Sequence, residues 1–202
     1  MTVQVKICGV TRMEDANAAV SAGADFVGFN FHAPSPRFVD LEAAKPLRDV
    51  IGAKAKVVGV FVNADRKFIE ERLRELRLDL LQFHGDEQES ALAGWPVPVI
   101  RAVRVQPGNA IQIRHTRADY VLIDTYNPNL YGGTGVARPL DDLRGLDLSR
   151  VFISGGLHPD NVADAAALGP YAVDTASGVE SAPGVKDHSK LRSFVIHAKS
   201  SG

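Results

Sequence analysis

The chain has 202 residues, which is enough for one well-buried core, and its 23 Lys and Arg against 24 Asp and Glu give a formal net charge of −1. That balance excludes a broad electrostatic attraction to nucleic acid or to an anionic membrane surface. A single cysteine excludes an internal disulfide framework and a multi-cysteine metal site, and without a signal peptide or an apolar run near ~20 residues we expect a cytoplasmic, membrane-free protein.

Short runs rich in Val, Ile and Phe recur along the chain, and a helix-like stretch follows each of them. This alternation is typical of repeated βαβ units. Several runs are apolar almost throughout, as expected for parallel strands that are covered on both faces. The eight candidate strands are residues 3–7, 26–31, 56–61, 78–83, 97–103, 120–123, 151–153 and 172–174.

Start and stop signals mark some of the intervening helices. Thr11 and Glu14 have the spacing of a capping box before an Ala-rich segment that ends at Gly23, and Asp86 and Glu89 have the analogous carboxylate spacing. In residues 65–78 the apolar side chains fall on one helical face and the charged ones on the other, which predicts a helix that packs on a sheet.

Eight strands in alternation with helices either close into a barrel or form an open doubly wound sheet. We favour one α/β domain over residues 1–202, a (β/α)8 TIM barrel. The strand count is eight, no linker interrupts the series, and no strand is followed by a dinucleotide-binding glycine fingerprint. In such a barrel the chemistry lies on the loops at the carboxyl ends of the strands.

Cys8 and Asp124 directly follow the first and the sixth candidate strands. A lone cysteine is more often a small buried hydrophobe, and an aspartate in a loop is more often a cap or a turn residue. At the mouth of a barrel, however, a thiol and a carboxyl group on different strands form the pair of base and acid that proton shuttling requires.

Three further polar residues follow candidate strands. Arg37 lies in a proline-stiffened loop after the second strand, where it is either a surface arginine or a preorganised fork for a carboxylate. Gln82 and His84 end the fourth strand, and we expect them to point to opposite faces, so that at least one lines the mouth. For His84, a structural polar role is favoured over catalysis.

Glycine-rich turns follow the last two strands, at 154–157 (SGGL) and 176–180 (ASGVE), and either alone would be an ordinary turn. Together they predict a phosphate site, because loops after the seventh and eighth strands of such barrels commonly bind phosphate through backbone N–H groups. A third glycine loop, residues 132–135, is a candidate flap or a further phosphate-facing turn. The candidate phosphate ligands are Ser154, Gly155, Gly156, Ala176, Ser177 and Gly178.

These pieces together resemble the phosphoribosylanthranilate isomerase family, with ordered matches along nearly the whole chain. The matching segments are KICGVTR, GADFVGFNFHAPSPRFV, VGVFVNAD, LLQFHG, LIDTYNP, GGTG, SGGLHPDNV and ASGVE. The chain departs from the family pattern at residues 136–140 (VARPL), where a lysine-containing run leading to Phe-Asp-Trp is usual.

The resemblance implies a barrel, monomeric or homodimeric, that isomerises phosphoribosylated anthranilate in tryptophan biosynthesis without a metal or an organic cofactor. It implies that Cys8 is the general base, that Asp124 is the general acid, and that Arg37 helps to hold the anthranilate moiety. Gln82, His84 and Gly133 are expected to contact the substrate as well.

Two alternatives remain. A phosphate-binding barrel with another sugar-phosphate substrate, or with no catalysis, would keep the glycine turns but not the acid and base. A neighbouring barrel enzyme is the other alternative: indole-glycerol-phosphate synthase would need a central lysine acid, and the histidine-pathway isomerase would need two aspartates where this chain has Cys8 first.

Overall fold

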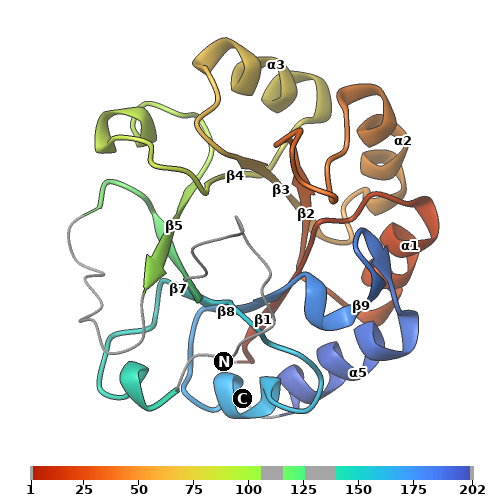
Figure 1. The fold of residues 1–202 in the computed structure, drawn as a ribbon, viewed down its shortest axis with the longest axis vertical. Helices are drawn as coiled ribbons and strands as arrows, with labels where there is room; N and C mark the ends of the chain where they lie inside the picture. Colours follow the sequence, from red (N-terminus) through yellow and green to blue (C-terminus); the bar gives the residue numbers. More distant parts are fainter. Residues whose placement is uncertain (1, 106–115, 126–139, 201–202) are drawn as a thin grey trace.

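The structure, a computed structural model, describes residues 2–105, 116–125 and 140–200. Eight parallel strands form a closed barrel in chain order from β1 to β8, with helices around its outside (Figure 1). The barrel is therefore confirmed over the open sheet. The strands are β1 (Gln4–Cys8), β2 (Phe26–Asn30), β3 (Lys56–Phe61), β4 (Leu80–Phe83), β5 (Val99–Val105), β6 (Tyr120–Thr125), β7 (Val151–Ile153) and β8 (Ala172–Thr175).

The helical layer is less regular than the sequence pattern predicts. In the described residues a short 3-10 helix, η1 or η2, follows β4 and β6, and a small hairpin of β9 and β10 precedes the last helix. The helical elements and the hairpin are α1 (Met13–Ala22), α2 (Leu41–Ile51), α3 (Arg66–Leu76), η1 (Glu89–Leu92), η2 (Leu140–Leu143), α4 (Val162–Ala166), η3 (Ser177–Val179), β9 (Glu180–Ala182), β10 (Val185–Lys186) and α5 (His188–Lys199).

The predicted capping boxes are wrong. Helix α1 begins after Arg12, and the Thr11 hydroxyl instead donates to the Gly184 carbonyl oxygen at 2.8 Å. The segment after β4 forms only η1, because Gly94 with φ of 75° and the following prolines end the helical turn early. By contrast α3 lies within the predicted 65–78 segment, and the Asp65 side chain caps its N-terminus.

Alternate residues of each strand point into the barrel, and these inward rows position the site. The apolar floor inside the barrel consists of Phe26, Val58, Leu80, Ile100, Ala102, Leu122, Phe152 and Ala172. A larger apolar layer lies between the strands and the helices. Because side chains alternate across a strand, residues two or four positions beyond the floor face the carboxyl-end mouth.

Three aspartates fasten neighbouring strands at the opposite end of the barrel. Each stands one residue before β2, β4 or β6 and accepts a hydrogen bond from a backbone N–H near the start of the preceding strand. The pairs are Asp25 with Val5, Asp79 with Val57 and Asp119 with Val99, each at 2.8 Å. The same contact before three of the four even-numbered strands stabilises the barrel away from its mouth. Within the residues that the structure describes, no helix is both long enough and apolar enough to cross a membrane.

Candidate functional site

A cavity at the carboxyl ends of the strands collects nearly all the predicted site residues. Every one of them that the structure describes lines this cavity except Gly178, and Leu157, Asp174 and Thr175 line it too. Gly133 and the rest of the 132–135 loop lie outside the described residues, as do residues 136–139. Cys8 and Asp124 stand inside β1 and β6 rather than after them, and both face this same space.

The inward rows explain which side chains meet. Cys8 lies two residues beyond the buried Lys6, and Asp124 lies two residues beyond the floor residue Leu122. Gln82 and His84 continue the row of β4, and their side chains are 3.0 Å apart. The expectation that they point to opposite faces is therefore wrong, because residues two positions apart share a face.

The surroundings of Cys8 contain a buried ion pair, in which Lys6 is fully buried and the Asp174 side chain is 7% exposed. Lys6 Nζ donates to Asp174 Oδ1 at 2.8 Å, and the Ser154 hydroxyl donates to Asp174 Oδ2 at 2.9 Å. Burial lowers the pKa of Lys6, but the Asp174 carboxylate and Cys8 more than offset this, so its pKa lies above the ordinary value and Lys6 stays cationic.

The Cys8 thiol is subject to opposing influences. Burial is the largest and raises its pKa, while the ammonium groups of Lys6 and Lys186 act in the opposite direction. The net result is a pKa above that of an ordinary thiol. The resting side chain is thus mainly protonated, with two cations close enough to stabilise the thiolate when it forms.

Asp124 is held by a relay of two side chains. Its Oδ2 lies 3.1 Å from His84 Nε2, and His84 Nδ1 lies 3.0 Å from Gln82 Nε2. The two contacts fix the plane of the His84 ring, with Nδ1 toward the Gln82 amide and Nε2 toward the Asp124 carboxyl group. Gln82 Oε1 is buried and has no hydrogen-bond partner among the described residues. This buried acceptor is available for a hydrogen bond from a group bound in the cavity.

The two glycine turns contact each other. Gly155 and Gly156 have φ of 87° and 72°, a conformation that glycine adopts without strain. The Thr175 hydroxyl donates to the Leu157 carbonyl oxygen at 2.7 Å, and a Cβ at Gly178 would come within 1.9 Å of that oxygen. Gly178 therefore packs against the first turn rather than lining the cavity.

Arg37 reaches the cavity from the loop after β2, but a protein carboxylate already binds one edge of its guanidinium. Its Nε and Nη2 donate to the two oxygens of Glu180 at 2.8 and 2.7 Å. The loop itself is braced by the Ser35 hydroxyl, which accepts from the Arg37 backbone N–H at 3.2 Å and from Asn30 Nδ2 at 3.1 Å. Sequence reasoning missed Glu180, Lys186, Lys6 and Asp174.

Neither a metal cluster nor a second reactive centre emerges from the rest of the described chain. No group of three or more His, Cys, Asp and Glu there is arranged to hold a metal ion. A larger hollow lies at the opposite end of the barrel, where Asp25 and Asp79 accept the strand bonds described above and also pair with Lys199 and Arg48. We assign that hollow to fold stability, because its carboxylates are already used.

The comparisons with known proteins agree along the whole chain. The family model described as N-(5'phosphoribosyl)anthranilate (PRA) isomerase matches residues 5–197. The N-(5'-phosphoribosyl)anthranilate isomerase of Pseudomonas fluorescens (strain Pf0-1) is 46% identical over 198 residues, which cover 96% of this chain and 97% of the relative. That of Geobacter metallireducens is 44% identical, with 98% and 99% covered.

Solved structures agree as well. The phosphoribosyl anthranilate isomerase of Thermus thermophilus superposes with a TM-score of 0.87 at 35% identity, covering 98% of this chain and 99% of the other. A second such isomerase, in complex with reduced 1-(o-carboxyphenylamino)-1-deoxyribulose 5-phosphate, superposes with a TM-score of 0.81 at 34% identity and the same coverage. Monomers generated from the dimeric enzyme of Thermotoga maritima give 0.82 at 32% identity, again with 98% and 99% covered.

Proposed function

The chain belongs to the N-(5'-phosphoribosyl)anthranilate isomerase family, and from that premise we propose that Cys8 and Asp124 perform the two proton transfers of its reaction. The enzyme is an aldose–ketose isomerase of tryptophan biosynthesis. The observation that carries the assignment is that these two side chains face one cavity from β1 and β6. Asp124 Oδ2 lies 3.1 Å from His84 Nε2, and the ammonium groups of Lys6 and Lys186 act to lower the pKa of the Cys8 thiol.

The reaction begins at the sugar ring. Asp124 gives its proton to the furanose ring oxygen as the bond from that oxygen to C1 breaks, and the anilino nitrogen supplies the electron pair that makes a C1=N iminium. His84 Nε2 binds Oδ2 of Asp124, so we assign the acidic proton to the other oxygen, Oδ1. Ring opening is therefore assigned to the β6 side of the cavity.

The second transfer takes place at C2. The Cys8 thiolate removes the C2 proton, and the electron pair of that bond forms the C1=C2 bond of an enolamine as the iminium becomes a neutral amine. Return of a proton to C1 and loss of the C2 hydroxyl proton give the ketone. Hydrogen is only relocated within the substrate and its two partners, so the step needs no oxidant or reductant.

The remaining contacts hold the substrate between acid and base. We assign the phosphate to the turns formed by Ser154, Gly155 and Gly156 and by Ala176, Ser177 and Gly178, the last by packing. Arg37 is assigned to the anthranilate carboxylate, and Gln82 and His84 to substrate contacts at the β4 wall. Gly133 stays a predicted contact.

Growth complementation tests the assignment directly. A tryptophan auxotroph that lacks only this step should grow with the wild-type chain and not with Cys8→Ser or Asp124→Asn. Growth on either variant at the wild-type rate would contradict the assigned roles. For the phosphate site, crystals soaked in sulfate should show the ion at the two turns, and density confined to other places would argue against them.

We also propose that the enzyme works in the cytoplasm, as a monomer or a homodimer, with neither metal nor organic cofactor. The relocation of hydrogen described above supports the last point. Dialysis against a chelator should leave turnover unchanged, and a loss that a divalent cation restores would contradict it. Light scattering of the purified protein gives its oligomeric state.

A further inference from the structure

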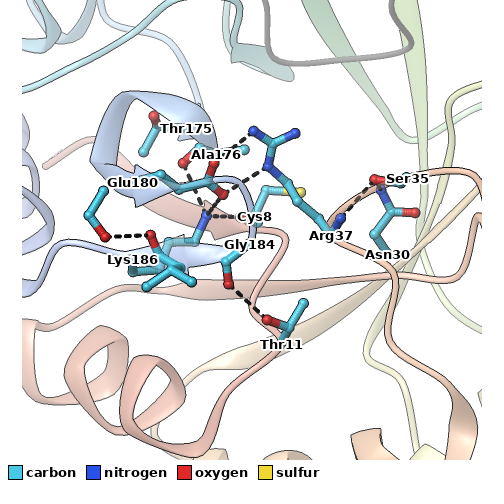
Figure 2. Close-up of polar contacts among 12 residues, drawn as sticks. Cys8, Thr11, Asn30, Ser35, Arg37, Thr175, Ala176, Glu180, Gly184 and Lys186 are labelled. Atoms are coloured by element: carbon cyan, nitrogen blue, oxygen red, sulfur yellow. Dashed lines mark hydrogen bonds and ion pairs between the residues drawn. The ribbon is translucent and has the colours of Figure 1, made fainter.

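The hairpin of β9 and β10 carries two buried charges that the proton transfers do not use. The Lys186 side chain is fully buried, and that of Glu180 is 5% exposed. Lys186 Nζ donates to the Cys8 carbonyl oxygen at 2.7 Å, to the Ala176 carbonyl oxygen at 3.0 Å and to Glu180 Oε1 at 2.9 Å (Figure 2). Burial lowers the pKa of Lys186, and the Glu180 carboxylate opposes that shift. The three acceptors around Nζ match the three N–H donors of an ammonium ion, and on this geometry we assign Lys186 a positive charge. A single cation thereby links the end of β1, the loop after β8 and the hairpin.

Glu180 lies between that cation and Arg37 (Figure 2). It binds Arg37 through two parallel hydrogen bonds, at 2.8 and 2.7 Å, which fix both the position and the plane of the guanidinium. Burial raises the pKa of Glu180, but the bonds from Arg37 and Lys186 overcome this and hold it below the usual value, so Glu180 remains a carboxylate.

The bidentate contact uses one edge of the Arg37 fork and leaves the other end for a ligand. Nε and Nη2 bind Glu180, whereas Nη1 makes no hydrogen bond to the described residues, and Arg37 lines the cavity. Two cations and one carboxylate leave the cluster with a net positive charge. An anionic substrate group therefore remains attracted to it.

The backbone around Arg37 allows little other placement. A Cβ at Gly9 would come 2.6 Å from Arg37 Cδ, so the aliphatic part of the arginine crosses the glycine that follows Cys8. On the other side, a Cβ at Gly184 would lie 2.9 Å from the Pro36 carbonyl oxygen. The arginine loop, the end of β1 and the hairpin are thus packed together.

We propose that Glu180 is a positioning residue: it holds the Nη1 end of Arg37 toward the carboxylate of the substrate, and Lys186 anchors Glu180 to the strand end that carries Cys8. The proposal rests on the role of Arg37 proposed above. On this proposal the preference for a substrate with a carboxylated arylamine depends on Arg37, Glu180 and Lys186 together, and not on Arg37 alone.

The sign of one substitution separates positioning from simple electrostatics. Glu180→Gln removes a negative charge beside Arg37, so a purely electrostatic effect would strengthen binding of an anion. Glutamine, however, offers one acceptor oxygen to two cationic donors and turns its NH2 toward one of them. If Glu180 positions the fork, binding of the carboxylate becomes weaker.

Two probes measure this effect: the reduced carboxyphenylamino-deoxyribulose phosphate, and its phenylamino counterpart without the carboxylate. We define the ratio as the Kd of the carboxylate-free probe divided by the Kd of the carboxylated probe. This ratio reports the carboxylate contact alone, and it falls when that contact is weakened. We expect Glu180→Gln to raise the Kd of the carboxylated probe by about tenfold or more. The scale comes from catalysis, where misplacement of a positioned group by ~1 Å costs up to ~10²-fold in rate. The carboxylate-free probe should change by less than about threefold. In steady-state kinetics the loss falls mainly on KM.

Controls keep the test decisive. Glu42→Gln makes the same change in an exposed pair with Lys45 and should leave the ratio unchanged. If Glu180→Gln does not fold, Glu180→Asp keeps the charge opposite Lys186 while drawing the carboxylate back by one methylene, and it should still lower the ratio. An unchanged or larger ratio in the variant that folds overturns the proposal.

Failure of the positioning role and failure of the Arg37 assignment give different results. If the wild-type ratio is near one, or Arg37→Ala leaves it unchanged, Arg37 does not hold the carboxylate and the proposed role of Arg37 is wrong. If Arg37→Ala lowers the ratio and the Glu180 variants do not, only the positioning role is wrong. In the Arg37→Ala background, Glu180→Gln should have no further effect on the ratio.

Discussion

Replacement of Cys8 by serine removes the sulfur assigned as base while changing little else in the site. The thiol packs closely, since a Cβ at Gly28 would come 2.9 Å from Sγ. The smaller hydroxyl fits that space without a clash, and Cys8 is only partly buried. A stability change therefore does not account for a large loss of turnover.

The expected loss follows from the chemistry. Proton transfer by a positioned group contributes about 10²–10⁴ in rate, and a serine hydroxyl is far too weak an acid to supply an anion beside Lys6 and Lys186. A fall in kcat/KM of that size corresponds to about 2.7–5.5 kcal/mol of lost transition-state stabilisation. Asp124→Asn should show a loss in the same range, because an amide keeps the contact with His84 but delivers no proton.

Three measurements separate loss of chemistry from loss of structure. Steady-state turnover of phosphoribosylanthranilate gives kcat/KM, binding of the reduced product analogue reports an intact site, and thermal melts report the fold. Asp49→Asn is the matched control, because this exposed aspartate lies at the other end of the barrel. Cys8→Ser with turnover within about tenfold of wild type would refute the mechanism, since that is below the range for a lost general base.

Three further outcomes are expected. Burial raises the pKa of the Cys8 thiol. The rate of alkylation of this sole cysteine should therefore reach half its maximum at a pH above the ordinary thiol pKa of about 8.5. A midpoint at or below that pH would contradict the described electrostatics. His84→Asn should lower kcat by about tenfold with a smaller rise in KM, because Asp124 loses the bond that orients it. A rise in KM with kcat unchanged would mean that His84 contributes only its substrate contact, and the orienting role would be wrong. Asp79→Ala should lower the free energy of unfolding, measured in urea, by about 1 kcal/mol, because the backbone N–H of Val57 in β3 loses its acceptor. Asp49→Ala, at an exposed position, is the control and should lower it by less.

The strands and the placement of the site were predictable because they depend on local pattern. Apolar runs locate parallel strands, and residues just beyond such a run face the mouth of a barrel. The placement of Cys8 and Asp124 at the mouth was predicted this way. Because side chains alternate along a strand, Gln82 and His84, two positions apart, should lie on the same face. The prediction of opposite faces applied this alternation wrongly.

The charged partners could not be paired from local pattern. Lys6 in β1 and Asp174 in β8 are visible as charges within apolar strands, but they are 168 positions apart in the chain. Only closure of the barrel makes β1 and β8 neighbours. Glu180 and Lys186 likewise lie in a hairpin that the alternation of strands and helices does not predict.

The strand pair that closes the barrel also contributes directly to the site. The register of the closing pair of strands places Lys6 opposite Asp174, and the Asp174 carboxylate binds both Lys6 and the Ser154 hydroxyl that opens the first glycine turn. A slip of this register would leave both buried charges without partners, at a cost of several kcal/mol. The same slip would move Cys8 away from the phosphate turns. The pairing that penalises an open or misregistered barrel is therefore also the one that places the proposed base, Cys8, beside the proposed phosphate turns.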